Sequence, residues 1–260
     1  MKHAVNKNKN EHHAQRTIFI VLPAFNEGST LATLFSRIDE SLNEVGLQYH
    51  VVLVDDGSTD DTLAIAKRFS GGMPISIKSH AVNQGLGATI RDGLVMAANL
   101  ASEHDIIITM DADDTHCPGL ILRMVEMVRE GFDVVIASRF QKNARVLGVP
   151  LHRRLLSRCA SMLFRCVLPI EGVKDFTCGY RAYRAEAIKK ALGQYGSAFF
   201  TRDGFECMVD ILLKLRNMGL IFGELPIILR YDHKDGHTKM NLSATIKNSF
   251  FLLIKRRLGR

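Results

Sequence analysis

The chain has 260 residues, 47% of them hydrophobic, and its 34 Lys and Arg residues against 27 Asp and Glu residues give a formal net charge of +7. This much apolar material can bury a core, which argues against a disordered chain, and no apolar run reaches the roughly 18 residues of a membrane-spanning helix. The positive charge favours an anionic partner, which could be nucleic acid, an acidic membrane surface or a phosphate-bearing small molecule.

Cysteine usage and the first residues bear on the compartment. The five cysteines, at positions 117, 159, 166, 178 and 207, form no Cys-x-x-Cys pair and no zinc-like group with histidine. This favours a reducing environment, so we expect a cytoplasmic protein. Residues 1–16 are polar, which predicts a flexible tail and not a secretory signal.

From Thr17 onward, short apolar runs alternate with amphipathic stretches. This alternation is typical of an α/β fold with a mostly parallel sheet flanked by helices. We expect strands at 17–22, 51–54, 106–110 and 134–138, and helices at 29–45, 59–69 and 118–130. In the first helix apolar residues recur every three or four positions, with Ser29 placed to cap the start and Gly46 to end it.

The chain becomes more basic after Arg139. Four arginines and no acid lie between His152 and Arg165, at positions 153, 154, 158 and 165, among apolar residues at helical spacing. A further helix is expected at about 204–218, with apolar runs at 220–224 and 227–231. Residues 17–232 are therefore predicted to form one domain.

Residues 233–260 are predicted to form a basic amphipathic segment that binds a membrane surface. They end in NSFFLLIKRRLGR, which joins an apolar cluster to a polybasic end, as helices lying in a membrane interface do. Each Lys or Arg near an anionic leaflet contributes about 1 kcal/mol to binding. The alternative, for 242–258 and for 155–167, is an ordinary surface helix whose apolar side packs on the core.

Two acidic clusters follow predicted strands: Asp55 with Asp56, and Asp111 with Asp113. Ligands of parallel α/β sheets bind beyond the carboxyl ends of the strands. On an extended backbone Asp111 and Asp113 would point to the same side, roughly 6–7 Å apart at Cα, and such oxygen ligands suit Mg²⁺ or Mn²⁺. The alternative is that the strand becomes polar where it leaves the core, with Asp capping the next helix.

The glycines in NQGLGATIRDG could belong to a dinucleotide-binding fingerprint. The stretch has Gly85 and Gly87 but lacks the third glycine, and it follows the acidic residues, so an oxidoreductase is disfavoured. The glycines instead indicate a tight turn or a close approach of two backbones. A nucleic-acid partner is also disfavoured, because no nucleic-acid-binding motif is present and the acidic clusters would repel a polyanion.

Seven motifs occur in order between about Ile18 and Lys239. They are VLPAFNE, VVLVDDGSTDDT, NQGLGATIRDGL, MDADDTH, ASRF, DFTCGYRAYR and DGHTKMN. With these motifs the chain resembles the family 2 inverting glycosyltransferases of GT-A fold, in particular the dolichol-phosphate mannosyltransferases and the bacterial polyprenyl-phosphate glycosyltransferases. The resemblance implies transfer of one sugar from a nucleotide-sugar donor, GDP-mannose or a UDP-sugar, to a polyprenyl or dolichyl phosphate. Processive synthases of this family carry a Q-x-x-R-W motif. This chain has no Trp, which disfavours a chain-elongating synthase.

The resemblance also implies roles for single residues. The donor-binding residues would be Pro23, Asn26, Glu27, Asp55, Gly87 and Asp111. The metal ligands would be Asp111 and Asp113, with Thr115 where dolichol-type members carry Gln. The catalytic residues would be Asp113 and Arg139, with Asp114 as a further candidate. The phosphate- or acceptor-binding residues would be Arg153, Arg154, Asp175, Arg181 and Lys239. Cys178 stands where the family usually has Ser.

The implied reaction develops negative charge on the leaving diphosphate, which Mg²⁺ or Mn²⁺ and arginines would stabilise. A lipid phosphate acceptor is already anionic and needs no general base. A sugar or other small hydroxyl acceptor, the main alternative, would need one, with Asp114 and Glu206 as candidates. A catalytically inactive nucleotide-sugar-binding module is the second alternative. Peripheral binding to the cytoplasmic face of a membrane, or a membrane partner subunit, would bring the site to a lipid.

Overall fold

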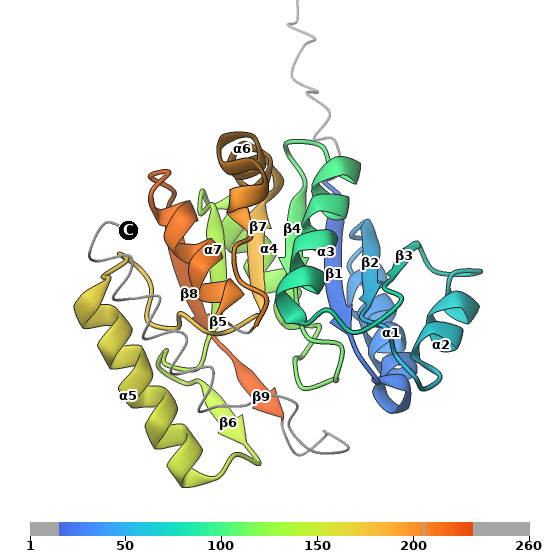
Figure 1. Cartoon of the computed structure of the whole chain (residues 1–260), viewed down its shortest axis with the longest axis horizontal. Coiled ribbons are helices and arrows are strands. Elements are labelled where there is room, and N and C mark those ends of the chain that lie inside the picture. Colours follow the sequence, from blue (N-terminus) through green and yellow to red (C-terminus); the bar gives the residue numbers. More distant parts are fainter. Residues whose placement is uncertain (1–15, 205, 231–260) are drawn as a thin grey trace, which may run out of the picture.

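The computed structural model describes residues 16–204 and 206–230, apart from the side chains of 152–154. Within these ranges seven strands form one sheet in the order β3-β2-β1-β4-β7-β5-β8 (Figure 1). The strands are β1 (Ile18–Ala24), β2 (Tyr49–Asp55), β3 (Ile75–Ser79), β4 (Ile106–Thr109), β5 (Val134–Ser138), β7 (Arg181–Arg184) and β8 (Phe222–Pro226). A second sheet pairs β6 (Arg145–Leu147) with β9 (Ile228–Arg230).

The main sheet is parallel apart from β7, which lies between β4 and β5 and runs antiparallel to both. The remaining neighbours pair in parallel, so the predicted α/β class with a mostly parallel sheet is confirmed. Because β2, β1 and β4 are adjacent, their carboxyl ends lie side by side. We call this margin the carboxyl edge of the sheet.

Helices cover the sheet. They are α1 (Gly28–Asn43), α2 (Thr62–Phe69), α3 (Leu86–Leu100), α4 (Leu120–Arg129), α5 (Leu151–Val167), α6 (Ala185–Tyr195) and α7 (Cys207–Arg216), with a 3₁₀ turn at Gly196–Phe199. Helices α3, α6 and α7 contact one another, and Figure 1 shows α3 and α7 in front of the sheet. Helix α4 packs on β4, β5 and β7, and α1 packs on α2.

The core consists of the strands and the apolar sides of the helices. Every residue of β4 and of β5 is buried, as expected for strands that are covered on both faces. Helix α3 packs closely on β1 because Gly93 has no side chain: a Cβ there would lie 2.3 Å from Val21 Cγ1. This contact fixes α3, whose amino end reaches the carboxyl edge.

Several predicted boundaries need correction. The first helix spans Gly28–Asn43 and not 29–45, the second begins at Thr62 and not at 59, and the strand expected at 106–110 ends at Thr109. The helix expected at 204–218 spans Cys207–Arg216. Gly46 does lie just past the first helix, with a φ of +68° and its N–H donating to the Asn43 carbonyl.

In the described part of the chain, no helix is both long enough and apolar enough to cross a membrane. The predicted tail 1–16 and the basic segment 233–260 fall outside the described residues, except for Arg16. The predicted domain limits therefore stay predictions.

Candidate active site

Three loops meet at the carboxyl edge. They are residues 25–27 after β1, 56–61 after β2 and 110–119 after β4. The first two loops are joined through Asn26, whose backbone has a φ of +52°. Its N–H donates to Ser58 Oγ at 2.9 Å, and its side-chain Oδ1 accepts from the Thr59 N–H at 2.8 Å. Asn26 thus holds the 25–27 loop against the 56–61 loop.

The amino end of α1 is capped by the neighbouring loop. The Glu27 N–H donates to Thr62 Oγ1 at 2.8 Å, and the Gly28 N–H donates to Asp60 Oδ2 at 2.9 Å. The prediction that Ser29 caps this helix is therefore wrong, because side chains far away in sequence supply the acceptors and no local side-chain cap forms. These contacts place Glu27 at the start of α1, where orphan N–H groups gather.

Asp55 ends β2 and is buried. Its Oδ1 accepts from the Ser58 N–H at 3.2 Å and its Oδ2 accepts from Ser79 Oγ at 2.9 Å. Pro23 pairs with Val54 on the adjacent strand, one position before Asp55. Four of the predicted donor-binding residues therefore cluster at the ends of β1 and β2: Pro23, Asn26, Glu27 and Asp55.

Gly87 lies in the first turn of α3, where the loop containing Arg202 and Asp203 crosses it. A Cβ at Gly87 would lie 2.0 Å from the Arg202 carbonyl oxygen, and the Gly87 N–H donates to the Asp203 carbonyl at 2.7 Å. Gly85, with a φ of +90°, precedes the helix. The expected tight turn and close backbone approach are both confirmed at these two glycines.

The 110–119 loop does not continue the strand. β4 ends at Thr109 and the chain bends through Asp111 and Asp113, so the extended backbone assumed for these two carboxylates is wrong. The side chain of Asp111 is 49% exposed, whereas Asp113 is buried. Asp113 Oδ1 accepts from the Thr115 N–H at 3.2 Å and from Thr115 Oγ1 at 2.6 Å. The Thr115 hydroxyl thus orients Asp113 in this structure.

Asp114 binds an arginine that the sequence analysis did not single out. Its φ is +54°, and both carboxylate oxygens accept from Arg37 Nη1 at 2.8 Å. Arg37 belongs to α1, which also donates from Thr30 Oγ1 to the Ala112 carbonyl at 3.3 Å. Helix α1 therefore anchors the loop that carries the acids. Arg37 lies 77 residues from Asp114, so no local sequence pattern could have indicated the pair.

The acidic residues can be tested against the metal that the sequence predicts. Among the described residues, no group of three or more His, Cys, Asp or Glu side chains is arranged to hold an ion. Mg²⁺ is commonly held by one or two carboxylates together with waters and substrate phosphates. Asp111 and Asp113 supply two carboxylates on one short loop, which fits that kind of site.

Arg139 follows β5 and is fixed by Asp175. Its Nε and Nη2 donate to Asp175 Oδ2 and Oδ1 at 2.8 and 2.7 Å, and Nη2 also donates to Thr177 Oγ1 at 2.5 Å. Asp175 is fully buried, which alone would raise its pKa, but the charge and hydrogen bonds of Arg139 lower that pKa below its usual value. The pair therefore places a permanent cation near the carboxyl edge.

Arg181, at the start of β7, is fully buried. Its guanidinium donates to the backbone carbonyls of Cys178, Met208 and Phe176 at 2.7–2.8 Å. In this structure Arg181 thus holds the 175–180 loop through backbone carbonyls, and Asp175 binds Arg139. Both had been predicted to bind phosphate or acceptor.

The 175–180 loop adjoins the acidic loop. Thr109 Oγ1 donates to the Gly179 carbonyl at 2.6 Å, and the Tyr180 hydroxyl donates to the Cys117 carbonyl at 3.0 Å. A Cβ at Gly179 would lie 3.5 Å from Asp111 Oδ1. The acids of the 110–119 loop and the loop that fixes Arg139 are therefore neighbours in space.

Three predicted residues cannot be placed. Arg153 and Arg154 belong to α5, but their side chains are not described, and Lys239 lies outside the described residues. Glu206, a candidate base, is buried just before α7. The structure adds two side chains that sequence reasoning missed: His80, which contacts Asp56, and Asp92, which contacts His80.

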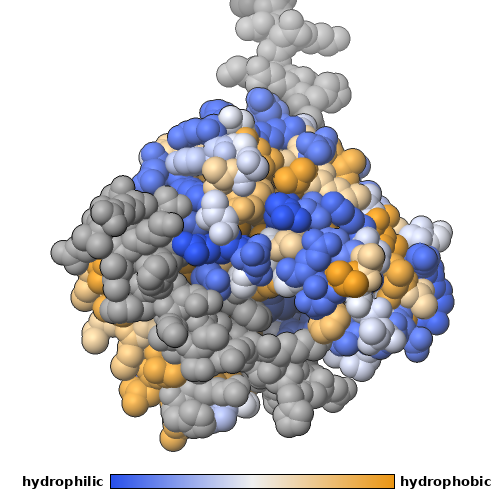
Figure 2. Space-filling view, viewed as in Figure 1, coloured by the Kyte–Doolittle hydropathy of each residue, from blue (hydrophilic) through white to orange (hydrophobic). Residues whose placement is uncertain are grey.

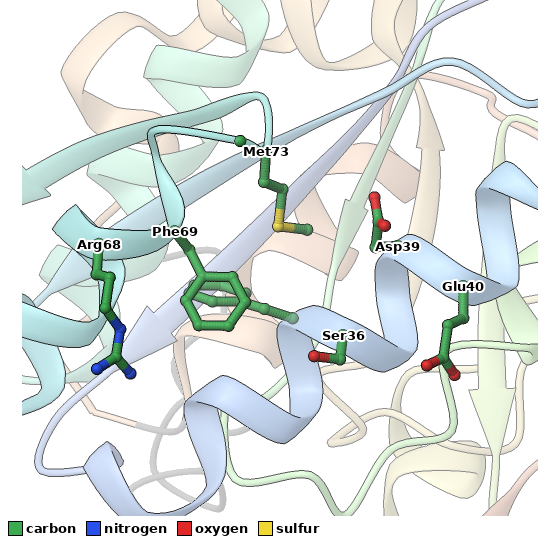
Figure 3. Close-up of a pocket in the computed structure, with 8 residues that line it drawn as sticks. Ser36, Asp39, Glu40, Arg68, Phe69 and Met73 are labelled. Carbon is green, nitrogen blue, oxygen red and sulfur yellow. The ribbon is translucent and has the colours of Figure 1, made fainter.

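A separate hollow of about 500 Å³ opens between α1 and α2 (Figure 3). Its lining consists of Phe35, Ser36, Asp39, Glu40, Arg68, Phe69, Gly72 and Met73. In Figure 3 the Phe69 ring and the Met73 thioether lie across from α1. None of these residues belongs to the three loops of the carboxyl edge, so this hollow is distinct from the candidate site.

The fold and these loops define a GT-A glycosyltransferase. The family model for glycosyl transferase family 2 matches residues 19–192, and the chain belongs to that family. Solved structures of glucosyl-3-phosphoglycerate synthase from Mycobacterium tuberculosis share the fold. The complex with Mn²⁺, UDP and glucosyl-3-phosphoglycerate gives a TM-score of 0.65 at 22% identity, covering 95% of this chain and 81% of that one. Another structure of that enzyme contains Mg²⁺ and UDP.

Two curated relatives have names that specify a substrate. The chain is 33% identical over 198 residues to a dolichol-phosphate mannosyltransferase of Pyrococcus furiosus, covering 76% of this chain and 52% of the relative. It is 29% identical over 252 residues to the polyprenol monophosphomannose synthase of Mycolicibacterium smegmatis, covering 95% of this chain and 90% of the relative. The chain thus spans about half the length of the Pyrococcus relative and most of the Mycolicibacterium relative.

Proposed function

We propose that the protein transfers a single hexose, with inversion, from a nucleotide-sugar donor to a polyprenyl or dolichyl phosphate, with Mg²⁺ or Mn²⁺ as cofactor. The observation that carries this proposal is the 110–119 loop, where Asp111 and Asp113 lie beside the loop that fixes Arg139. Carboxylates for a cation and a fixed guanidinium are the groups that a departing nucleoside diphosphate requires. The names of the two curated relatives support the acceptor class.

The donor half of the site is built from the ends of β1 and β2. Pro23, Asn26, Glu27 and Asp55 would surround the nucleoside, with Gly87 at the start of α3 close by. Asp55 is buried and held by Ser58 and Ser79, so its carboxylate is fixed in place before any ligand arrives. A preorganised contact loses little conformational entropy on binding.

Asp111 and Asp113 would hold the divalent cation, with donor phosphates and water completing its coordination. When bound, the cation supplies a positive charge that stabilises the leaving diphosphate. Thr115 keeps the Asp113 carboxylate in one orientation. Arg139, fixed by Asp175, adds a second positive charge that needs no rearrangement during the reaction.

The state of Asp114 favours a phosphate acceptor over a hydroxyl acceptor. A general base must have a carboxylate oxygen within hydrogen-bond reach of the acceptor hydroxyl, and a carboxylate whose oxygens both contact an arginine is not placed for that role. Both oxygens of Asp114 contact Arg37. A lipid phosphate is anionic already and needs no base. The hydroxyl-acceptor alternative would therefore rest mainly on Glu206.

The test is a panel of GDP- and UDP-sugars with a polyprenyl phosphate, run with and without chelator, on the native protein and on Asp113→Ala. We expect one donor to be used, with turnover that both the chelator and the substitution abolish. Turnover that survives both would overturn the proposed mechanism. Products formed only with hydroxyl acceptors would favour the alternative, and donor binding without any turnover would indicate an inactive module.

A lipid acceptor also requires access to a membrane, and α5 offers a suitable surface. Leu155 and Met162 are each 64% exposed, and Leu151, Leu156 and Leu163 are exposed beside them. Figure 2 shows hydrophobic atoms gathered at the lower left, where Figure 1 places α5. The exposed Arg158 and Arg165 border this apolar side, and α5 contains no acid. We propose that α5, together with the predicted basic segment 233–260, rests on an anionic cytoplasmic leaflet.

Sedimentation of the full chain with vesicles tests this surface. We expect binding to phosphatidylserine vesicles, with weaker binding to pure phosphatidylcholine. The double variant Leu155→Glu, Met162→Glu should bind less, whereas Leu100→Glu, at an exposed leucine that ends α3, should behave as the native protein. Equal binding of all three would exclude α5. A chain truncated at about residue 240 that still binds fully would exclude the 233–260 segment.

A further inference from the structure

His80 directly follows β3, and its side chain is only 4% exposed. Its Nδ1 lies 2.7 Å from Asp56 Oδ1 and its Nε2 lies 3.0 Å from Asp92 Oδ2. A neutral imidazole has a single N–H and can donate to only one of two carboxylates, whereas the imidazolium donates to both. The geometry therefore calls for the protonated ring.

The surroundings can balance that charge. Lys78 Nζ lies 2.8 Å from Asp92 Oδ2, and Arg91 Nε lies 2.8 Å from Asp92 Oδ1. The titratable and charged groups around His80 are thus Asp56, Asp92, Lys78 and Arg91. Burial alone would lower the pKa of His80, but its hydrogen bonds and charge interactions with Asp56 and Asp92 raise that pKa above its usual value.

Asp56 links His80 to the start of α3. Its Oδ1 accepts from the Gln84 N–H and its Oδ2 accepts from the Gly85 N–H, both at 2.9 Å. The same stretch lies tightly against Gly57, where a Cβ would be 2.7 Å from the Val82 carbonyl carbon. The position of residues 82–85 therefore depends on where the Asp56 carboxylate is held.

His80 also contacts the donor half of the site through its backbone. Its N–H donates to the Asp55 carbonyl oxygen at 2.8 Å. His80 thus holds Asp55 through its main chain and Asp56 through its side chain. Two residues beyond Gly85 is Gly87, which we expect to line the donor site.

We propose that His80 is a positioning residue for donor binding. As an imidazolium between Asp56 and Asp92, it holds the Asp56 carboxylate over the Gln84 and Gly85 amides and so fixes the amino end of α3 beside the nucleotide-sugar. This inference rests on the proposed function, because it assumes that the donor binds between Asp55 and Gly87. The structure itself shows each contact in the series that runs from Asp92 through His80 and Asp56 to Gly85.

Losing the proton leaves one carboxylate facing a ring nitrogen lone pair. The stabilisation is therefore complete below the unfolded-state pKa, near 6.5, and is lost as the pH rises through the higher folded-state value. Donor affinity should weaken over the same interval. A group that only packed in the core would change stability without this link between proton and donor.

The variant His80→Gln should bind the donor about tenfold more weakly at pH 6, which is the effect of one lost charge-assisted hydrogen bond. Its donor affinity should no longer weaken between pH 6 and 9, and kcat should change much less than KM. His80→Arg, which keeps a cation, should recover part of the affinity. The matched control is His50→Gln, since His50 is on β2 and contacts Ser76 instead of a carboxylate.

Two readouts need no donor. The imidazole resonances of His80 should titrate above pH 6.5, and the Gln84 and Gly85 amides should lose protection from hydrogen exchange in His80→Gln. Asp92→Asn keeps the Asp56 contact and should lower the His80 pKa, which gives a second variant if His80→Gln does not fold. Unchanged protection and donor affinity in both variants would overturn the proposal. If the native protein binds no nucleotide-sugar, the proposed function fails, and the amide and imidazole measurements still decide the role of His80.

Discussion

The 56–61 loop and the 110–119 loop both follow buried parallel strands, and both carry several aspartates at the carboxyl edge. In the first, the acids bind protein donors: Asp56 caps two backbone amides and Asp60 caps the start of α1. In the second, Asp111 stays about half exposed while Asp113 and Asp114 are oriented by Thr115 and Arg37. The acids of the first loop thus build the loop itself, whereas Asp111 in the second loop leaves a carboxylate open to solvent.

The largest expected effect comes from exchanging one acid in each loop. Asp111→Asn should lower turnover about 100-fold or more, because it removes a carboxylate proposed to hold the cation that stabilises the leaving diphosphate, with little change in melting temperature. Asp56→Asn should instead destabilise the fold by about 2 kcal/mol, because a charged hydrogen-bond acceptor is removed from buried donors. Steady-state kinetics and thermal unfolding measure both, with Asp61→Asn, an exposed acid, as control. If the two variants changed turnover and melting temperature equally, the proposed difference between the acids of the two loops would be contradicted.

The next largest effect concerns the fixed cation. Arg139→Met leaves Asp175 buried without its partner and should cost about 3 kcal/mol of unfolding free energy at pH 7. Because the pKa of Asp175 is lowered in the folded protein, its contribution is present above its unfolded-state pKa and disappears as the pH falls through the folded-state value. Urea unfolding should therefore show that the difference in unfolding free energy between the native protein and Arg139→Met becomes smaller at acidic pH.

The exposed pair Arg129–Glu126 provides the control for that experiment. Arg129→Met should change stability by less than about 0.5 kcal/mol. If the difference in unfolding free energy between the native protein and Arg139→Met stays constant down to acidic pH, the ionisation of Asp175 does not cause the loss of stability.

A smaller effect is expected at the anchor of the acidic loop. Arg37→Met should cost about 1 kcal/mol of unfolding free energy, since its side chain is partly exposed. Asp114→Gly loses the same ion pair but relieves the left-handed backbone at φ +54°, so its stability should stay closer to that of the native protein. Chemical denaturation compares the two, and a greater loss for Asp114→Gly would contradict this account of the loop.

The smallest effect is chemical and leaves the fold intact. Burial raises the pKa of Cys178 to about 12 and that of Cys207 to about 12, with nearby carboxylates adding to the rise. Cys117, Cys159 and Cys166 are exposed. Brief alkylation at pH 8 followed by mass spectrometry should label these three and spare the other two. Labelling of Cys178 in the folded protein would show that the 175–180 loop opens.

The alternation of apolar runs was enough to predict the α/β class, since strands such as β2 and β5 are buried on both faces and need continuous apolar sequence. The motifs after β2 and β4 placed Asp55 and Asp111 at the carboxyl edge. The antiparallel β7 was not predicted, because its four residues carry no periodicity of their own.

Contacts between segments that are distant in sequence could not be predicted either. Arg37 and His80 find their carboxylate partners through tertiary folding, and Ser29 failed as a cap because Asp60 and Thr62 replaced it. Asp111 and Asp113, the two carboxylates predicted to bind metal, were expected on an extended strand, and the bend after Thr109 depends on packing that no local pattern records.

The insertion of β7 between β4 and β5 constrains the order of assembly during synthesis. β1 to β4 contain only early sequence and can pair as they leave the ribosome. β5 cannot complete its place in the sheet until residues 181–184 have been translated, after all of α5. Until then the backbone of β4 forms an open edge of the nascent sheet.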